Sequence, residues 1–259
     1  MEIFITLFGL CIGSFLTVVV YRVPRKLSVV TPMRSFCPQS DRTLTWWENI
    51  PVLSYLILGG KSRYTKNPIP FRYPLIEMMT GAFCIGTYFR FGLTPTSVII
   101  FCLLCSLVAI TFIDLEFLII PNVISFPGMT IGLLLGICAQ YTNWLQAPLT
   151  QGALDSLLGF LIGGGFFYAV GAGYYLLTKR VGLGGGDIKL LGMTGAILGV
   201  NSVIPTILAG SLIGVVVGVL SIVLKGGGRH SEIPFGPWLS LGTILYIFGG
   251  AQLFPFLQP

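Results

Sequence analysis

The sequence predicts an all-α membrane protein, a polytopic bundle of about eight transmembrane helices with a cytoplasmic loop subdomain. The first observation is composition: of 259 residues, 54% are hydrophobic and 9% are charged, with a mean hydropathy of +0.89. A soluble domain carries about 25% charged residues, so this chain lacks the polar surface to cover a core in water. The second is a series of apolar segments of membrane-spanning length. The third is the gathering of basic residues in alternate connections.

A membrane-spanning helix needs about 20 mainly apolar residues. Seven segments satisfy or approach this requirement: Ile3–Tyr21, Leu75–Phe91, Thr96–Ile113, Val123–Ala139, Leu154–Leu177, Val203–Leu224 and Trp238–Phe256. The shorter segment Leu190–Val200 is predicted as the sixth crossing of eight. We expect it to cross as a tilted or partial helix, or to be completed by Lys189 and Asn201 at its ends.

The basic residues predict the orientation of these segments. Nine of the 15 Lys and Arg residues lie between Arg22 and Arg72. If the N-terminus is outside and the crossings alternate, the cytoplasmic connections hold 14 of the 15, and only Arg90 lies elsewhere. This agrees with the positive-inside rule. Because Glu2 precedes the first apolar segment and basic residues follow it, we expect a retained helix rather than a cleavable signal peptide.

The predicted organisation has three parts: a first transmembrane helix over 1–23, a cytoplasmic subdomain over 24–73 and a membrane domain over 74–259. The basic charge of the second part is expected to face membrane lipid headgroups, and no nucleic-acid partner is predicted. Glycines four residues apart recur within the spans, and such pairs allow helices in lipid to approach closely. The pairs are Gly9/Gly13, Gly132/Gly136, Gly159/Gly163 and Gly210/Gly214/Gly218.

Two acids stand out because ionisable groups at membrane depth indicate function by default. Asp114 ends the third predicted span, and Asp187 follows the glycines Gly184, Gly185 and Gly186. The predicted topology puts both at the cytoplasmic membrane boundary. Two carboxylates in a partly dry site cannot both ionise cheaply, so they share a proton. One can then activate water while the other donates a proton, which is the chemistry of aspartic proteolysis.

Other interpretations of these residues stay open at this point. Asp187 has the position of a helix N-cap. The glycine run resembles a phosphate-binding loop, although no Walker lysine follows it. An alternative function is a proton-coupled membrane transporter that uses the two intramembrane aspartates, with the short sixth segment as a broken helix. A purely structural membrane subunit would leave the glycine run before Asp187 unexplained, whereas glycines there let an extended substrate backbone approach closely.

The ordered motifs resemble the type IV prepilin peptidase family, whose members are GxGD aspartyl proteases. Gly184-Gly185-Gly186-Asp187 resembles the GxGD signature, and Asp114 with Ile120-Pro121-Asn122 resembles the first aspartate block. The remaining matching stretches are Cys37-Pro38, Leu44–Tyr55, Phe71–Glu77 and Glu232–Pro237.

The resemblance implies a bifunctional enzyme of the bacterial cytoplasmic (inner) membrane. It would cleave the leader from type IV prepilins or type II secretion pseudopilins after a glycine, with Asp114 and Asp187 as catalytic residues and Gly184–Gly186 along the substrate path. The segment 74–259 would be the peptidase domain. The enzyme would then methylate the new N-terminal residue with S-adenosylmethionine as the methyl donor, a reaction linked to the 24–73 loop.

The loop departs from the family in one respect. Most members carry two CxxC pairs spaced to bind zinc, and the aligned positions here are Cys37, Ser40, Ser62 and Thr65. One thiolate does not make a tetrahedral zinc site, so no metal is predicted. Packing by Trp46, Trp47 and Tyr55 is expected to hold the loop instead. The polar candidates for methylation are Asn49, Arg72 and Glu77, for which purely structural roles, as a boundary anchor for Arg72 and an ion-pair partner for Glu77, are the alternative.

Overall fold

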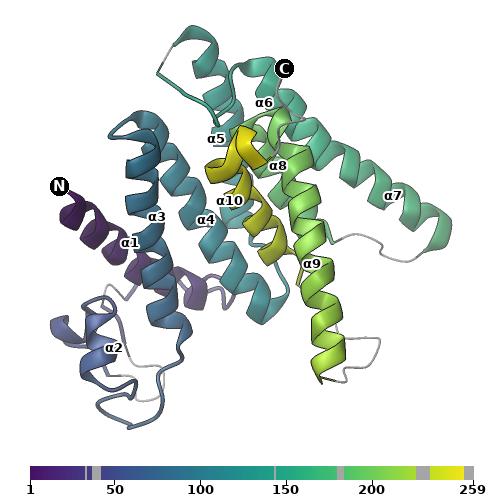
Figure 1. The fold of residues 1–259 in the computed structure, drawn as a ribbon. Helices are drawn as coiled ribbons and strands as arrows, with labels where there is room; N and C mark the ends of the chain where they lie inside the picture. The colour runs from purple at the N-terminus through teal and green to yellow at the C-terminus, as the bar shows by residue number, and fades with distance from the viewer. Residues whose placement is uncertain (33, 37–41, 143, 180–183, 226–233, 254–259) are drawn as a thin grey trace. The chain divides into compact units, whose positions relative to one another are not determined.

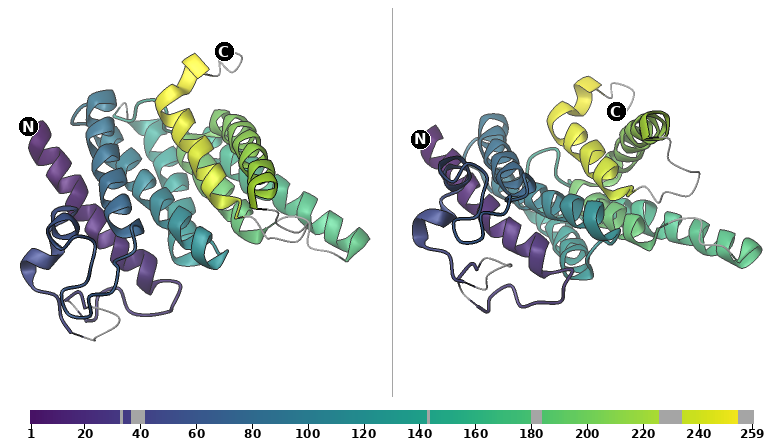
Figure 2. Two further views of the ribbon diagram at one scale, coloured as in Figure 1. Left: turned by 60° about the horizontal axis from the view of Figure 1, so that its bottom comes forward. Right: turned by 90° about the horizontal axis from the view of Figure 1, so that it is seen from below.

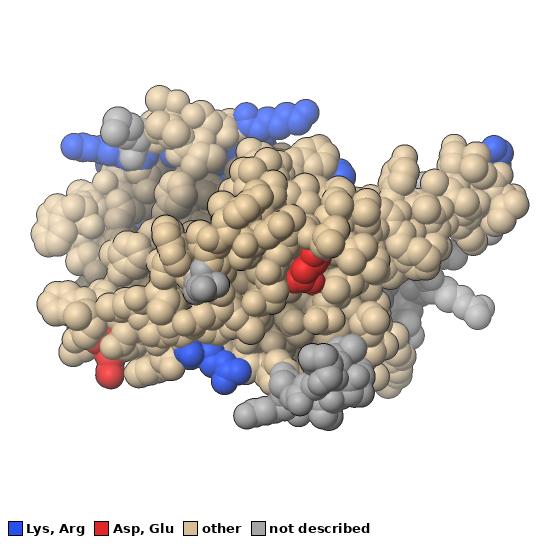
Figure 3. Space-filling model, turned by 90° about the horizontal axis from the view of Figure 1, so that it is seen from above, with Lys and Arg blue, Asp and Glu red and all other residues tan. Residues whose placement is uncertain are grey.

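We analysed a computed structural model of the chain. It describes all residues except 33, 37–41, 143, 180–183, 226–233 and 254–259, and the described part is all-helical, with no β-strand beyond two isolated bridges. Five of its helical segments are long and apolar enough to cross a membrane: Glu2–Arg22, Pro95–Phe117, Asn122–Tyr141, Ala153–Thr178 and Val200–Leu220. The chain is therefore a polytopic helical membrane protein. In agreement, uncharged residues dominate the face drawn in Figure 3.

All eight predicted segments are helical in the described residues, and the chain divides into two compact units, Met1–Ala109 and Ile110–Pro259. In unit 1, α1 (Glu2–Arg22) runs alongside α3 (Arg72–Phe91) (Figure 1). A Cβ added at Gly9 would lie 2.5 Å from Cβ of Cys84, and one at Gly13 would lie 2.7 Å from Cα of Glu77. The predicted glycine pair therefore sets this close helix contact.

The loop between α1 and α3 has little regular structure. It contains the 3₁₀ turn η1 (Trp46–Asn49), the short helix α2 (Leu53–Ile57) and two isolated bridges, Phe36 to Thr43 and Lys61 to Pro68. Helix α4 (Pro95–Phe117) follows α3 and contributes its last turns to unit 2.

Unit 2 contains α5 (Asn122–Tyr141), α6 (Ala153–Phe160), the π-helical turn η2 (Leu161–Phe166) and α7 (Phe167–Thr178). After these come α8 (Gly185–Leu198), the 3₁₀ turn η3 (Val200–Ser202), α9 (Val203–Lys225) and α10 (Gly236–Leu253). Helices α9 and α10 lie side by side in both views of Figure 2.

Helix α8 is the predicted sixth crossing, and it forms the core of unit 2. It packs against α5, α6 and η2, and every residue from Leu190 to Leu198 is buried. Gly159 faces the backbone of Gly195, and Gly163 faces that of Leu191. At ~1.5 Å per residue, its 14 residues are shorter than a bilayer core of about 30 Å. Surrounding helices cover α8 from Leu190 to Leu198, so this buried part need not be as long as a helix that faces lipid.

Candidate active site

Asp114 lies in the last turn of α4 and is buried, with 6% of its surface exposed. The backbone N–H of Gly236 donates a hydrogen bond of 3.0 Å to its Oδ2 atom. Gly236 is the first residue of α10, so a free N–H at a helix N-terminus, where anions are favoured, contacts the carboxylate. This hydrogen bond therefore connects the Glu232–Pro237 motif near the end of the chain to the motif that contains Asp114.

Asp187 is the third residue of α8, and the residue at the N-cap position is Gly184. The N-cap interpretation of Asp187 was therefore wrong: the helix begins earlier than the apolar pattern indicates and includes Asp187 and Lys189. Asp114 acts electrostatically on Asp187, which means that the two carboxylates are close enough to repel each other when both are charged. Residues 73 positions apart thus share one site within unit 2.

The side chain of Ile120, from the motif of the first aspartate, lies beside a glycine of each of the other two motifs, Gly186 and Gly236. A Cβ added at Gly186 would lie 3.1 Å from Cγ1 of Ile120, and one at Gly236 would lie 3.3 Å from its Cδ1 atom. The same Cβ at Gly236 would lie 2.7 Å from Oδ2 of Asp114. Glycine at these two positions therefore leaves room beside the carboxylates, whereas Gly185 has open space around it.

Lys189 is a site residue for which the sequence analysis assigned no chemistry. Its Nζ donates a hydrogen bond of 2.8 Å to Oδ1 of Asn122, and it lies 5.6 Å from the centroid of the Phe126 ring. Lys189 follows Asp187 by two residues and Asn122 follows Ile120 by two. The pair therefore ties the start of α8 to the start of α5. Its nearness to the glycine-aspartate signature was the only sequence signal for this role.

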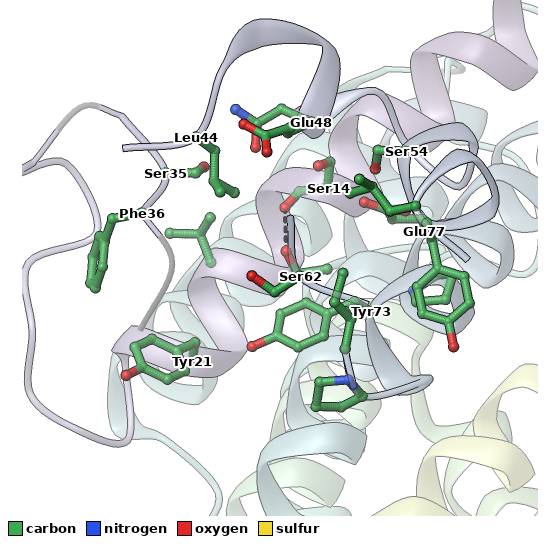
Figure 4. Close-up of a pocket in the computed structure, with 18 of the residues that line it drawn as sticks. Ser14, Tyr21, Ser35, Phe36, Leu44, Glu48, Ser54, Ser62, Tyr73 and Glu77 are labelled. Carbon is green, nitrogen blue, oxygen red and sulfur yellow. Dashed lines mark hydrogen bonds between the residues drawn. The ribbon is translucent and has the colours of Figure 1, made fainter. Parts of the chain in front are cut away.

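The three loop candidates, Asn49, Arg72 and Glu77, all line one cavity in unit 1, with a volume of about 370 Å³. Its walls come from α1, α2, α3 and the connecting loop, and Figure 4 shows Glu77 of α3 beside Ser14 of α1 and Ser54 of α2. Residues spread over more than sixty positions thus line one cavity.

Among the residues that the structure describes, the hydrogen bonds to Glu77 come from neutral groups and not from the base that an ion-pair role would require. Its Oε2 atom accepts the backbone N–H of Val52 at 2.7 Å, and the Ser14 hydroxyl also hydrogen-bonds to it. Val52 has φ +62°, and the N–H of Leu53 bonds to the carbonyl of Pro51 at 2.6 Å. This is a strained γ-turn. A strained turn aimed at a buried carboxylate marks the pocket as a functional candidate.

Glu48 is a pocket residue that sequence reasoning missed. Its Oε2 atom accepts bonds from the Thr45 N–H at 2.7 Å, the Thr45 hydroxyl at 2.6 Å and the Tyr64 hydroxyl at 3.2 Å. Burial raises the pKa of Glu48, but these bonds and the charge of Arg63 outweigh burial and lower the pKa below its usual value. The capping pattern Thr45-x-x-Glu48 was the available sequence signal.

The expectation for the aromatic residues of the loop was correct only in part. Trp46 is 79% exposed, so it does not hold the loop by packing. The Arg63 guanidinium carbon lies over the Trp47 ring, 5.3 Å from its centroid. The ring centroids of Tyr55 and Phe71 are 6.3 Å apart. Hydrogen bonds to Glu48 and Glu77 hold the loop, a role that had been expected of Trp46.

Of the four positions aligned with the family's cysteine pairs, Cys37 and Ser40 lie outside the described residues. Ser62 and Thr65 lie in one tight turn, where the Thr65 N–H approaches the Ser62 hydroxyl at 3.4 Å. The Lys61–Pro68 bridge closes the same hairpin. Hydrogen bonds thus fix this turn. The prediction that no zinc binds there stays a prediction.

Two family models match the chain. "Bacterial Peptidase A24 N-terminal domain" covers residues 7–91, and "Type IV leader peptidase family" covers residues 99–219. No solved structure matches.

Among curated relatives, a protein of Xanthomonas campestris pv. campestris is 36% identical over 95% of this chain and 90% of its own length. One of Aeromonas salmonicida is 34% identical over 94% and 89%, and one of Pseudomonas aeruginosa is 32% identical over 95% and 90%. All three are named "Prepilin leader peptidase/N-methyltransferase". This chain is therefore a multi-pass membrane protein that belongs to the type IV leader peptidase family.

Proposed function

We propose that the protein is a membrane aspartic endopeptidase that removes the leader from type IV prepilins or pseudopilins, with Asp114 and Asp187 as its catalytic pair. The observation that supports this assignment most directly is that the surroundings of the two acids meet at one side chain. Ile120 lies beside Gly186, which precedes Asp187, and beside Gly236, whose N–H bonds to Asp114. The chain aligns with nearly the full length of relatives that are named as peptidases, which favours hydrolysis over the transport alternative.

The proposed chemistry follows from one shared proton. The ionised carboxylate accepts a proton from water, whose oxygen attacks the scissile carbonyl carbon. The protonated carboxyl group donates its proton to the departing amine as the C–N bond breaks. A carboxylate pair suits both steps because repulsion keeps one member protonated. The α10 N-terminus at Asp114 fixes one carboxylate in place while the reaction proceeds.

The substrate is proposed to enter beside Gly184–Gly186. A Cβ at Gly184 would lie 2.7 Å from Oδ2 of Asp187, and one at Gly186 would crowd Ile120. Only glycine leaves an extended peptide room to approach the acids here. The distribution of basic residues supports a cytoplasmic position for this edge of the bundle, where a leader that precedes a hydrophobic segment would be accessible.

The unit 1 pocket is proposed as the methylation site, with S-adenosylmethionine as donor. The residues fit such a ligand. A volume of about 370 Å³ lies within the range of about 300–1,000 Å³ usual for small-molecule sites. Glu48, Glu77 and several tyrosine rings line it, and acids and aromatic faces both attract a cation such as a sulfonium. The donor supplies the methyl group. In this proposal Glu77 would hold a cationic group, Arg72 would pair with a carboxylate, and Asn49 would supply neutral hydrogen bonds.

The test of the dyad uses the full chain purified in detergent, a prepilin substrate and labelled S-adenosylmethionine, with cleavage and methylation scored separately. Asp114→Asn and Asp187→Asn are each expected to abolish cleavage while the variants insert and elute as the parent does. Glu116→Gln, a neighbouring acid on α4 outside the proposed pair, is the matched control and should cleave normally. Robust processing by either dyad variant would refute the catalytic assignment.

A further inference from the structure

The apolar side of the short helix α2 faces outward from the loop subdomain. Leu53, Leu56 and Ile57 stand at i, i+3 and i+4, so they share one helix face, and their exposed fractions are 51%, 67% and 65%. The opposite side presents Ser54, Tyr55 and Leu58 to the pocket. We call Leu53, Leu56 and Ile57 the outer stripe. An apolar stripe turned away from its own subdomain marks a contact with something else.

The depth of α2 in the membrane follows from its contacts with α3. The N–H of Val52, directly before α2, bonds to Glu77, which lies five residues after Arg72, the first residue of α3. At ~1.5 Å per residue, this is about 7 to 8 Å along the helix axis. The Tyr55 ring of α2 also contacts Phe71 at the N-cap of α3. Helix α2 is therefore fixed beside the first turns of α3, whose residues from Leu75 to Phe91 are predicted to span the membrane (Figure 1).

We infer that the outer stripe is a membrane-interfacial anchor that lies in the headgroup–acyl boundary of the bilayer. Interfacial helices bury their apolar face about 5–10 Å into this boundary, which agrees with the position of α2 beside the predicted start of the second span at Leu75. Lys61 lies four residues after the last residue of α2 and is exposed, so it complements anionic headgroups near the outer stripe. The occupant of the stripe is thus lipid, and α2 is a wall of the pocket with lipid on its outer side.

The experiment places a photoreactive diazirine side chain at position 56, or at position 57, in the full chain. The matched control carries it at Lys66, which is exposed on the hairpin that follows α2. Each protein is reconstituted in vesicles of phosphatidylethanolamine and phosphatidylglycerol, illuminated and analysed by mass spectrometry. We expect lipid adducts at positions 56 and 57 in several-fold excess over position 66. Adducts to another part of the chain, to a second copy or to water at 56 and 57 would overturn the proposal, as would equal lipid yields at all three positions.

A second measurement needs no altered residue. Hydroxyl-radical footprinting of the native chain in the same vesicles reports the water accessibility of each peptide. The peptide with residues 53–58 should be protected relative to the peptide with residues 61–68. Protection that is absent in vesicles would reject the anchor even if the labelled variants fold poorly. Neither measurement depends on cleavage or methylation, so failure here is distinct from failure of the proposed function.

Discussion

The backbone N–H of Gly236 donates a 3.0 Å hydrogen bond to Oδ2 of Asp114 across 122 residues of sequence. The donor belongs to a helix N-terminus that has no intrahelical acceptor for it. A buried carboxylate without such a partner would be costly. The bond therefore links the position of α10 to the position of the first proposed catalytic acid. A substitution at Gly236 is expected to alter the orientation of the Asp114 carboxylate.

Gly236→Ala should reduce cleavage while the protein still folds. The new Cβ would lie 2.7 Å from Oδ2 of Asp114, and the end of that side chain can rotate away. The carboxylate then loses its orientation. We expect kcat/KM to fall by about tenfold or more, equivalent to ~1.4 kcal/mol of transition-state stabilisation. Gly173→Ala on α7, where nothing lies within 4 Å, is the control and should cleave at the parent rate. Unchanged cleavage by Gly236→Ala would show that this hydrogen bond does not orient the acid.

Two glycines of unit 2 should separate folding from catalysis. A Cβ at Gly159 would lie 2.1 Å from the carbonyl oxygen of Gly195, whereas one at Gly186 would lie 3.1 Å from the movable side chain of Ile120. Gly159→Ala is therefore expected to lower Tm in detergent, because two backbones must separate. Gly186→Ala should keep the parent Tm and lose cleavage through crowding of the substrate path. A parent-like cleavage rate for Gly186→Ala would return this glycine to a structural role.

The Lys189–Asn122 hydrogen bond should act as one unit. Lys189→Met and Asn122→Ala each remove the link between the starts of α8 and α5, so each should lower kcat more than KM changes, because orientation is lost rather than binding. Residues in direct contact have coupled effects. The double variant should therefore lose little more than either single variant. Losses that multiply in the double variant would mean that the two residues act independently.

Much of this fold follows from simple sequence patterns. Apolar length predicted the long helices, and glycine spacing predicted several of their contacts, because polar residues mark the ends of helices in lipid and small residues mark their contacts. The short helix α2 (Leu53–Ile57) was not predicted. The predicted start of α8 was wrong, and the error also has a physical cause. Gly185 and Gly186 are poor helix formers, so the sequence gives no sign that the helix includes them. Tertiary packing of α8 against α5 and α6 overrides that preference.

The loop subdomain was harder to predict because local pattern does not determine which groups meet. Glu48 and Glu77 are 29 positions apart in sequence but line the same cavity. Hydrophobic residues suggested aromatic packing, yet buried acids with backbone and hydroxyl donors hold the loop. The hydrogen bond to Glu77 comes from the turn at Val52, whose φ of +62° no β-branched residue favours.

The hydrogen bonds to Glu48 predict a loop that loosens in acid. The pKa of Glu48 in the folded protein lies below its usual value. Its stabilising contribution is therefore complete above the unfolded-state pKa of about 4.3 and is lost as the pH falls through the lower folded value. Limited proteolysis of the native protein should cut the loop faster at pH values below that range than at neutral pH. Glu48→Gln should be cut faster already at neutral pH, with little further pH dependence. An equally steep acid response in Glu48→Gln would assign the effect to another group.

The unit 1 pocket should carry methyl transfer independently of cleavage. Glu77→Gln keeps an oxygen that accepts the Val52 N–H but removes the negative charge, so the loop should stay folded while attraction for a cationic group is lost. Arg72→Ala removes the proposed partner of a carboxylate from the same cavity. Both variants should cleave a prepilin at close to the parent rate, because Asp114 and Asp187 are unchanged, and both should methylate the product several-fold more slowly.

Cleavage and methylation should be measured in the same sample, so that their rates can be compared directly for each variant. A KM for the methyl donor that rises in Glu77→Gln with cleavage intact would assign the charge to donor binding, whereas a fall in kcat alone would assign it to orientation of the new amine. Parallel loss of the two activities would show that the pocket supports the whole enzyme structurally. A parent protein that never methylates would reject the methylation site, and the serine and threonine at positions 62 and 65, where the family pattern has cysteines, would then be the first residues to restore.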